Sequence, residues 1–391
     1  MMVSFDEYAF HQAVFRVAFP LVFPLAKLKF RYAYEKLSGI PEPYLLLANH
    51  NTDFDPIFLG LASEHQVYFV ATEKILRMGL LSPFVMRFFH PIIHYKGKTG
   101  ISSVKEILGR LRERKNVALF PEGNRSFNGL TGDFVSATGK LAKRSGVTLV
   151  TYRLRGGYFT SPRWGKGLRR GRMQGEIAHV YPPKTLKQMS EREINEAIRQ
   201  DLFVDAYSDQ KRQRIPYKGK NLALGLESTL FQCPQCGAVS SLHSRGNEIF
   251  CSCGYRAEYD VFGYLHDGDG SVMTITDLDK RQHEAVEDLL EQSSATLLFE
   301  DSVKVESIGP DHQVLSEART TLRAWRDGLA VGELFLPFSS ITGMAINQRN
   351  LLIIHYTLEE NGHLELSGDL SFSALKYLYL YQSARKINEK I

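Results

Sequence analysis

The chain has 391 residues, of which 43% are hydrophobic and 23% charged, and this globular composition excludes a chain dominated by low-complexity sequence. Its length exceeds what one hydrophobic core usually fills, so we expect two or three domains. Residues 1–222 carry 35 Lys and Arg against 19 Asp and Glu, whereas residues 223–391 carry 13 against 24. We therefore expect the first part, and not the second, to attract anionic partners such as lipid headgroups, phosphates or acidic proteins.

The N-terminal sequence does not have the pattern of a secretory signal peptide. Asp6 and Glu7 precede the first apolar stretch, where a signal peptide carries basic residues. The apolar run 13–26 is interrupted by an arginine and two prolines, and it is shorter than the roughly 20 residues that cross a bilayer. We therefore predict a cytoplasmic site of action and no membrane span from this run alone.

Residues 1–40 are predicted to form an amphipathic helix that lies in the membrane interface. Aromatic side chains on one side of this helix are expected to enter the lipid, and the cations that follow to lie near lipid phosphates. These residues are Phe10, Phe15, Phe19 and Phe23, followed by Lys27, Lys29 and Arg31. Such a helix would place the protein peripherally at the cytoplasmic face of the cell membrane, with anionic lipids as partners. The alternative is a helix that packs on the core of the soluble domain.

Residues 41–222 are predicted to form one domain in which buried strands alternate with helices, an α/β layer architecture. Strands are expected at 44–50, 65–72, 116–123 and 147–154. Helices are expected at 101–115, with a capping box of Ser103 and Glu106, and after Ser190, with Glu193 completing the cap. The turns at the strand ends are the expected place for a functional site.

The composition changes after Leu222, and all four cysteines fall in the segment 229–256. Residues 257–391 are predicted to form a C-terminal α+β domain. Its expected elements are a helix at 277–292, strands at 333–338 and 350–358, and a closing helix from about Ser373.

A histidine and an aspartate stand five residues apart at the end of the first predicted strand. Pro56 biases Asp55 away from helix, so the chain can fold back and bring the carboxylate toward the imidazole of His50. A carboxylate that accepts from one ring nitrogen leaves the other free to take a proton from a hydroxyl. No G-x-S-x-G elbow is present, so the substrate hydroxyl itself could attack.

Two other readings of this block stay open on spacing alone. An ordinary polar turn contains the same residue types. A metal site could use His50 with Asp53, Asp55 and Glu122, although no second histidine stands nearby at ligand spacing.

A second constellation, FPEGNRS, occupies residues 120–126. It leaves a buried strand, turns at Pro-Glu-Gly and presents Arg125, the Ser126 hydroxyl and backbone N–H groups, a combination that suits phosphate oxygens. A surface turn with an ion pair between Glu122 and Arg125 is the alternative.

Together the two motifs, N-H-x-x-x-x-D (HX4D) and F-P-E-G-x-R-S about seventy residues later, resemble the glycerophospholipid acyltransferase family, specifically the 1-acylglycerol-3-phosphate acyltransferases. The resemblance covers roughly residues 40–210 and implies a mixed β-sheet flanked by helices. It implies that His50 is the general base and Asp55 its orienting partner. It also implies that Glu122, Gly123 and Arg125 help to hold the glycerol phosphate.

The sequence departs from the family pattern in two places. Lys96 stands where the family often has an arginine, which keeps the charge but loses the two-pronged geometry of a guanidinium, and it is predicted to contact the phosphate. The strand near 146–151 lacks the prolines that the family often shows, which leaves the acceptor and acyl-chain preference open.

The segment 163–172 carries five cations, no carboxylate and Trp164. These residues suit an anionic headgroup surface, and a solvated loop or a docking site for an acidic carrier protein are the alternatives.

Four cysteines form two close pairs, each followed by a glycine that permits a tight turn. They are Cys233, Cys236, Cys251 and Cys253. This spacing predicts a ribbon-like site for a structural zinc ion, with all four positions filled by protein. The acidic character of residues 223–391 disfavours binding of nucleic acid.

The predicted function is transfer of a fatty acyl group from acyl-CoA or acyl carrier protein to the free hydroxyl of lysophosphatidate, which gives phosphatidate. An acyltransferase for another lysophospholipid acceptor is one alternative. The other is a non-catalytic zinc-ribbon interaction protein that the acyltransferase-like part anchors at the membrane.

Overall fold

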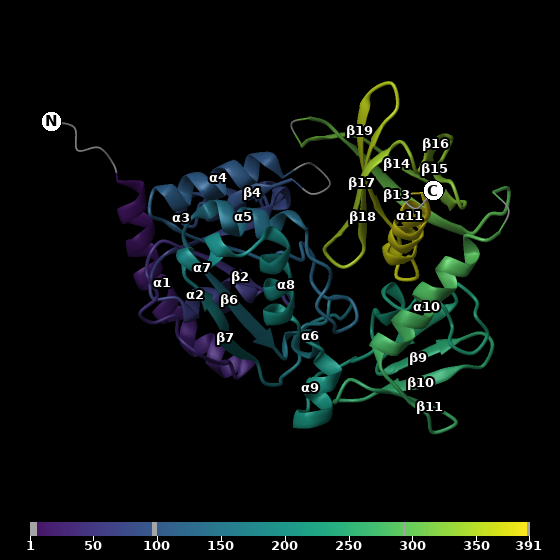
Figure 1. Ribbon diagram of the computed structural model, residues 1–391. Helices are drawn as coiled ribbons and strands as arrows, with labels where there is room; N and C mark the ends of the chain where they lie inside the picture. The colour runs from purple at the N-terminus through teal and green to yellow at the C-terminus, as the bar shows by residue number, and fades with distance from the viewer. Residues whose placement is uncertain (1–5, 96–99, 293, 311, 389–391) are drawn as a thin grey trace. The chain divides into compact units, whose positions relative to one another are not determined.

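The computed structural model describes residues 6–95, 100–292, 294–310 and 312–388. The chain divides into two compact units, and Figure 1 labels many of their helices and strands. Unit 1 falls within Met1–Tyr95, Thr99–Pro162 and Arg169–Tyr217, and unit 2 falls within Arg163–Leu168 and Lys218–Ile391.

A seven-stranded mixed sheet forms the centre of unit 1, with the strand order β1-β7-β6-β2-β5-β3-β4. The pairs from β6 through β2, β5 and β3 to β4 are parallel, and β7 runs antiparallel to β6. The strands are β1 (Ala33–Tyr34), β2 (Tyr44–Ala48), β3 (Val67–Thr72), β4 (Ile92–His94), β5 (Asn116–Leu119), β6 (Thr148–Arg155) and β7 (Gln174–Tyr181). The predicted mixed sheet is confirmed.

Helices cover this sheet, as the predicted α/β layers require. They are α1 (Glu7–Phe30), α2 (Asp55–Ala62), η1 (Glu73–Arg77), α3 (Leu81–Phe88), α4 (Ile101–Arg112), α5 (Ala137–Ser145), α6 (Gly157–Thr160), α7 (Pro183–Gln188), α8 (Glu191–Leu202) and α9 (Ala206–Gln213). The capping box predicted before α8 is present, with Ser190 and Glu193 each bonded to the other's backbone. The one predicted for α4 is wrong, because α4 begins after Gly100 and Ser103 bonds to the Gly100 carbonyl inside the first turn.

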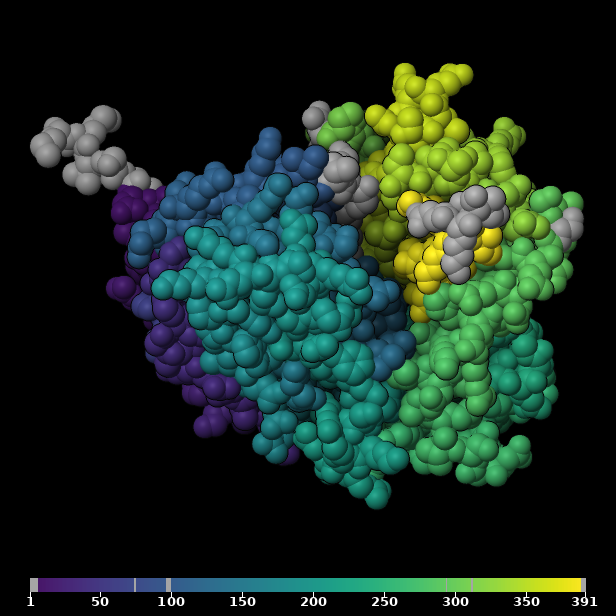
Figure 2. Space-filling view, in the orientation of Figure 1, coloured from purple at the N-terminus to yellow at the C-terminus, as the bar shows by residue number. Residues whose placement is uncertain are grey.

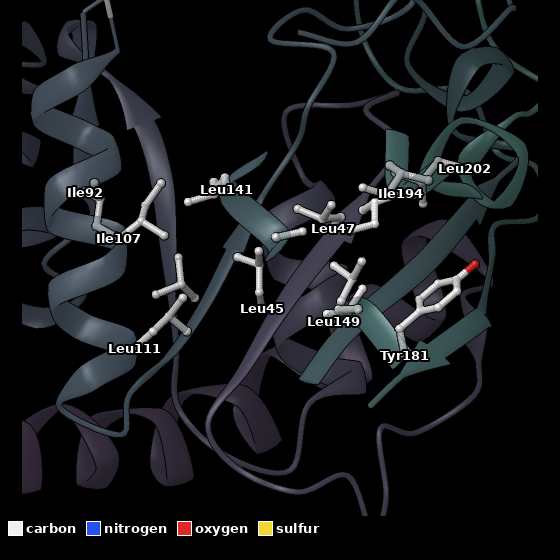
Figure 3. Packing of buried hydrophobic residues seen from close by; sticks show 14 residues of the cluster. Leu45, Leu47, Ile92, Ile107, Leu111, Leu141, Leu149, Tyr181, Ile194 and Leu202 are labelled. Carbon is white, nitrogen blue, oxygen red and sulfur yellow. The ribbon is translucent and has the colours of Figure 1, made fainter. Parts of the chain in front are cut away.

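The main core of unit 1 lies between the sheet and the helices α4, α5 and α8. Leu45 and Leu47 of β2 belong to one buried cluster with Ile107 of α4 and Ile194 of α8, and Figure 3 shows Leu47 beside Ile194. In Figure 2, the teal residues, which include α7 and α8, cover the face of unit 1 that is turned toward the viewer. Burying each such Leu or Ile contributes roughly 1.5–3 kcal/mol to stability.

Helix α1 uses its aromatic side differently from the prediction. Phe15 is buried, and its ring centroid lies 4.4 Å from that of Phe19 with 40° between the planes. Phe19 contacts Gly60 so closely that a Cβ there would lie 2.1 Å from the ring. Phe19 therefore packs on α2 and Phe15 is buried, so for these two rings the expectation that they enter lipid is wrong. The face of α1 that points outward is aliphatic, with Leu21 70% exposed.

Unit 2 begins with a five-stranded antiparallel sheet, which carries the cysteine segment. Its strands are β8 (Leu242–Arg245), β9 (Glu248–Cys251), β10 (Arg256–Tyr259), β11 (Leu265–Asp267) and β12 (Val272–Met273). The short helix η2 (Leu226–Ser228) precedes it, and α10 (Ile275–Leu289) follows.

A seven-stranded antiparallel sheet completes unit 2, in the order β16-β15-β14-β13-β19-β18-β17, and α11 (Ala374–Asn388) ends it. The strands are β13 (Phe299–Ile308), β14 (Val314–Ala324), β15 (Gly328–Val331), β16 (Leu334–Pro337), β17 (Ile341–Asn347), β18 (Leu351–Thr357) and β19 (Asn361–Ser367). The α+β class predicted for this region is confirmed.

Trp164 does not serve as an interfacial anchor. Its side chain is 0% exposed and meets the Tyr259 ring edge to face at 5.4 Å within unit 2. The expectation of a Trp at a headgroup surface is therefore wrong. The indole is a core group of unit 2, and Arg163 beside it is also buried and donates to the Ile346 carbonyl.

Candidate active site

The sheet topology brings the two sequence motifs together. Strands β2 and β5 are parallel neighbours, with Leu47 opposite Leu119 in the register. The segments that follow the two strands therefore leave the sheet at the same side, at the carboxyl ends of the strands. The His50 block follows β2 and the Pro-Glu-Gly turn follows β5. Ligands bind at this edge in open α/β sheets, because the loops beyond the carboxyl ends of the strands form a crevice.

Direct hydrogen bonds join the two turns. The His50 backbone N–H donates to Glu122 Oε1 at 2.7 Å, and the Ser126 N–H donates to the His50 carbonyl at 3.0 Å. The ring of Phe120 stacks on the His50 imidazole at 4.3 Å with 17° between the planes. The second motif therefore holds His50 in two ways, through its backbone and through one face of its imidazole ring.

His50 and Asp55 form the predicted pair. The His50 Nδ1 atom lies 2.8 Å from Asp55 Oδ2, and the imidazole is 20% exposed while the carboxylate is fully buried. Because an ionised carboxylate only accepts, Nδ1 carries the hydrogen and Nε2 is left as the acceptor. This is the arrangement that a general base for a hydroxyl requires.

The Asp55 carboxylate is fixed by the turn that precedes it. The backbone N–H groups of Asn51 and Thr52 donate to Oδ2 at 2.6 and 2.8 Å, and the Thr52 hydroxyl donates to Oδ1 at 2.6 Å. Asp55 is also the first residue of α2, where the helix dipole favours a negative charge. The His50 imidazole is thus oriented by a carboxylate that itself has little freedom to move.

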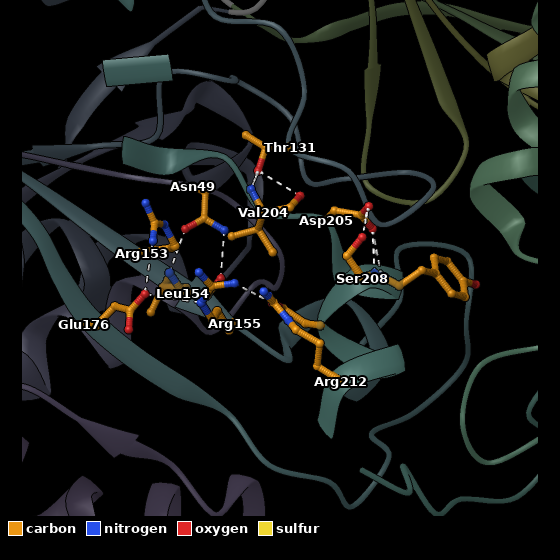
Figure 4. Close-up of polar contacts among 12 residues, drawn as sticks. Asn49, Thr131, Arg153, Leu154, Arg155, Glu176, Val204, Asp205, Ser208 and Arg212 are labelled. Carbon is orange, nitrogen blue, oxygen red and sulfur yellow. Dashed lines mark hydrogen bonds and ion pairs between the residues drawn. The ribbon is translucent and has the colours of Figure 1, made fainter. Parts of the chain in front are cut away.

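Glu122 ties the site together. Its two oxygens accept from the N–H groups of His50 and Gly132, at 2.7 and 2.6 Å. Gly132 is in turn placed by its neighbour Thr131, which exchanges backbone and hydroxyl bonds with Val204 (Figure 4). Glu122 therefore fixes the backbone of His50 relative to the loop that follows the second motif.

We expect the ionisation of Glu122 to make stability depend on pH. Burial raises the pKa of Glu122 to about 8, with a further increase from the Asp55 charge, against the two N–H hydrogen bonds that lower it. The folded protein then holds a proton that the unfolded chain has lost. Stability falls as the pH rises from about 4.5 to about 8, by up to about 1.4 kcal/mol per pH unit from this group.

Chemical denaturation across this pH range, on the protein and on Glu122→Gln, measures that slope. The amide does not titrate, so the fall should be absent in the variant even though it is less stable at every pH, because its NH₂ faces an N–H donor. The exposed Glu196→Gln is the control and should keep the slope. Equal slopes in the protein and Glu122→Gln would refute the shifted pKa.

Arg125 and its neighbours lie beside this pair. The guanidinium is buried, and its Nε atom is 3.3 Å from Asp53 Oδ1. Gly123 has a φ of 64°, a left-handed conformation that suits glycine and lets the turn close with its N–H on the Phe120 carbonyl. The Ser126 hydroxyl donates to the Leu130 carbonyl at 2.6 Å and accepts from the Gly129 N–H, so it shapes the following turn. Lys96 lies outside the described residues.

Asn49 is the first residue of the N-H-x-x-x-x-D motif, and the sequence analysis gave it no role of its own. Its amide donates to the Leu154 carbonyl at 2.8 Å and accepts from the Leu154 N–H at 2.7 Å, as seen in Figure 4. Asn51 donates to the same carbonyl at 2.9 Å. This clamp fixes the His50 block to the end of β6. The paired asparagines around His50 were the available signal.

Gly157 makes room for the same block. A Cβ at this position would lie 2.6 Å from the Asn51 Cβ and 3.0 Å from the Thr52 Cγ2. The start of α6 therefore approaches the His50 turn at a distance that only glycine allows.

The four cysteines come together in unit 2. Their Sγ atoms all lie within 4.8 Å of one another, a group that could hold a metal ion. The two Sγ atoms are 3.7 Å apart in the pair Cys233–Cys253 and 3.9 Å apart in the pair Cys236–Cys251. These distances are close to the roughly 3.8 Å between sulfur atoms around a tetrahedral zinc ion with zinc–sulfur bonds of about 2.3 Å. The donor set and its dimensions fit zinc.

Residues 31–155, which contain both motifs, match the family model described as Acyltransferase. This part of the chain is an acyltransferase-family domain, as the two motifs predicted. The chain is also similar to the crystal structure of the 1-acyl-sn-glycerophosphate (LPA) acyltransferase PlsC from Thermotoga maritima. The TM-score is 0.41 and the identity 18%, over 54% of this chain and 79% of that chain. No curated protein matches the chain significantly.

Proposed function

We propose that the protein transfers a fatty acyl group from an acyl thioester to the free hydroxyl of 1-acylglycerol-3-phosphate, giving phosphatidate. The observation that carries this proposal is the His50–Asp55 pair at 2.8 Å, joined by backbone hydrogen bonds to the turn that presents Arg125. A base for a hydroxyl and a buried cation for a phosphate thus stand on adjacent turns. The acyl donor is acyl-CoA or acyl carrier protein.

The reaction follows from the roles of these groups. His50 Nε2 takes the proton of the acceptor hydroxyl while the hydroxyl oxygen forms a bond to the thioester carbonyl carbon. The carbon–sulfur bond then breaks, and the leaving thiolate receives the proton that the imidazole holds. Arg125 binds the acceptor phosphate, and this binding energy positions the hydroxyl at the base.

An acceptor panel with a radiolabelled acyl thioester tests the proposal. We expect label in phosphatidate, with a rate at least tenfold above that for monoacylglycerol, because the latter lacks the group that Arg125 would bind. Transfer to other lysophospholipids only would show that the proposed acceptor is wrong and that the proposed reaction, acyl transfer from a thioester, is right. No transfer to any acceptor would contradict the proposal and favour a non-catalytic zinc-ribbon interaction protein.

We also propose that the protein works at the cytoplasmic surface of the cell membrane, where its lipid substrate resides. The outward face of α1 supports this, because it carries exposed aliphatic residues at helical spacing: Val17, Leu21, Leu25 and Leu28. The basic residues Arg16, Lys27 and Lys29 of the same helix would attract anionic lipids. In the described part of the chain, no helix is both long and apolar enough to cross a membrane.

Replacement of Leu21 by glutamate should weaken binding to vesicles that contain anionic lipid by about tenfold or more. The change removes an apolar contact and adds a charge that the surface repels. Leu370→Glu, at a leucine of unit 2 that is 50% exposed, is the matched control and should bind as the parent does. Co-sedimentation with vesicles measures both, and equal binding by the two variants would exclude this face of α1.

The cysteine cluster is proposed to hold one structural Zn²⁺. All four ligands come from the chain, which leaves no coordination position for a substrate. The ion would therefore stabilise unit 2 and take no part in acyl transfer.

A further inference from the structure

An acidic residue inside the first motif is paired with the cation of the second. Asp53 lies between His50 and Asp55, and its Oδ1 atom is 3.3 Å from Arg125 Nε. The two partners differ in environment, since the Arg125 side chain is 10% exposed and that of Asp53 is 76% exposed. One partner is therefore fixed in the site, while the other can turn into solvent at little cost.

The turn around Asp53 is held by other groups. The Asp55 carboxylate binds the N–H groups of Asn51 and Thr52, and the Thr52 hydroxyl accepts from the Phe54 N–H at 3.1 Å. Pro56, directly after Asp55, is the second residue of α2. None of these contacts uses the Asp53 carboxylate, so its pairing with Arg125 is not what shapes the motif.

We infer that Asp53 is a counter-ion that the acceptor phosphate displaces from Arg125, and that it sets how strongly the site favours phosphate-bearing acceptors. This inference rests on the proposed function. A phosphate monoester carries up to two charges and can bind a guanidinium through two oxygens, whereas the Asp53 carboxylate makes one contact at 3.3 Å. Asp53 also repels the incoming phosphate. Both effects lower the affinity for the acceptor and leave the chemistry at His50 unchanged.

The test compares the KM and kcat of the full chain with those of Asp53→Asn. We expect the KM for lysophosphatidate to fall by about twofold to fivefold at unchanged kcat. This fold-change corresponds to the interaction free energy of an exposed ion pair. The KM for the thioester should not change. Asp53→Glu should have the KM of the parent because it keeps the negative charge. Asp133→Asn, at an exposed aspartate of the loop after the second motif, should also have the KM of the parent.

Inorganic phosphate provides a readout that does not need turnover. Titration calorimetry should show tighter phosphate binding by Asp53→Asn than by the parent, in the same ratio as the KM values. An unchanged or increased KM together with unchanged phosphate binding would overturn the inference, and weaker binding would instead make Asp53 an orienting partner of Arg125. If the parent transfers no acyl group to lysophosphatidate, the proposed function fails, while the calorimetry still decides the role of Asp53.

Discussion

Replacement of His50 by alanine should reduce kcat for acyl transfer by about 10²–10⁴-fold, the usual contribution of a positioned general base. The imidazole is the group whose Nε2 would take the hydroxyl proton, and its Nδ1 is committed to the buried Asp55 at 2.8 Å. Because the imidazole is partly exposed and packs against one ring, its loss should leave the fold intact. Initial rates with a labelled thioester, together with a thermal melt, measure both effects.

The matched control is His65→Ala, at a histidine whose side chain is 50% exposed and whose contact with Glu42 is long, at 3.9 Å. It should keep the parent rate and melting temperature. Asp55→Asn should lower kcat as His50→Ala does, because an amide that donates to the ring selects the wrong tautomer. A His50→Ala protein that turns over at the parent rate would remove His50 from the mechanism.

Replacement of Cys233 by serine should release the metal and cause the largest loss of stability. Structural zinc supplies about 10–16 kcal/mol of apparent folding free energy in isolated zinc modules, which is comparable to the stability of a whole domain. Cys233 is buried, and its partner Cys253 is 3.7 Å away. We expect one zinc ion per chain in the parent and none in the variant, by elemental analysis. The melting temperature should fall by on the order of 10 °C or more.

The effect should extend beyond the cysteine turns because they support a buried charge. Lys376 of α11 is 1% exposed, pairs with Asp301 at 2.6 Å and also donates to Ser240, which follows the first cysteine pair. Disorder of that turn would remove a partner from a buried ammonium, which is costly. Ser252→Ala, at an exposed position between two of the cysteines, is the control and should keep the metal. A Cys233→Ser protein with the parent's zinc content and melting temperature would exclude the metal site.

Local patterns in the sequence predicted the strands β2, β3, β5 and β6 and the helices α4 and α8, but not β1, β4 or β7. The buried run before His50 predicts β2, and the Ser190–Glu193 pattern predicts the start of α8, because each depends on neighbouring residues. The two motifs share one edge of the sheet because β2 and β5 are parallel neighbours. That pairing is a long-range property, and it was predictable here only through the resemblance to a family.

The errors have a common physical origin. Periodicity shows that one side of α1 is aromatic and another aliphatic, but it does not show which side the rest of the chain covers. Phe15 is buried and Phe19 packs on Gly60 of α2, whereas the aliphatic side faces outward. Trp164 stands in a basic segment that suggests a surface, yet it is a core residue of unit 2. The clamp of Asn49 on Leu154 joins residues more than a hundred positions apart, so no local pattern predicts it.

A single-turnover experiment tests the central claim, that His50 activates the lipid hydroxyl for direct attack on a thioester. Purified protein in excess is mixed with labelled acyl-CoA, with and without lysophosphatidate, and quenched at intervals. We expect label to pass directly into phosphatidate, free thiol to be released only when the acceptor is present, and no label to be bound covalently to the protein. Release of thiol with covalent labelling of the protein before acceptor is added would contradict it, because the acyl group would then pass through an enzyme nucleophile.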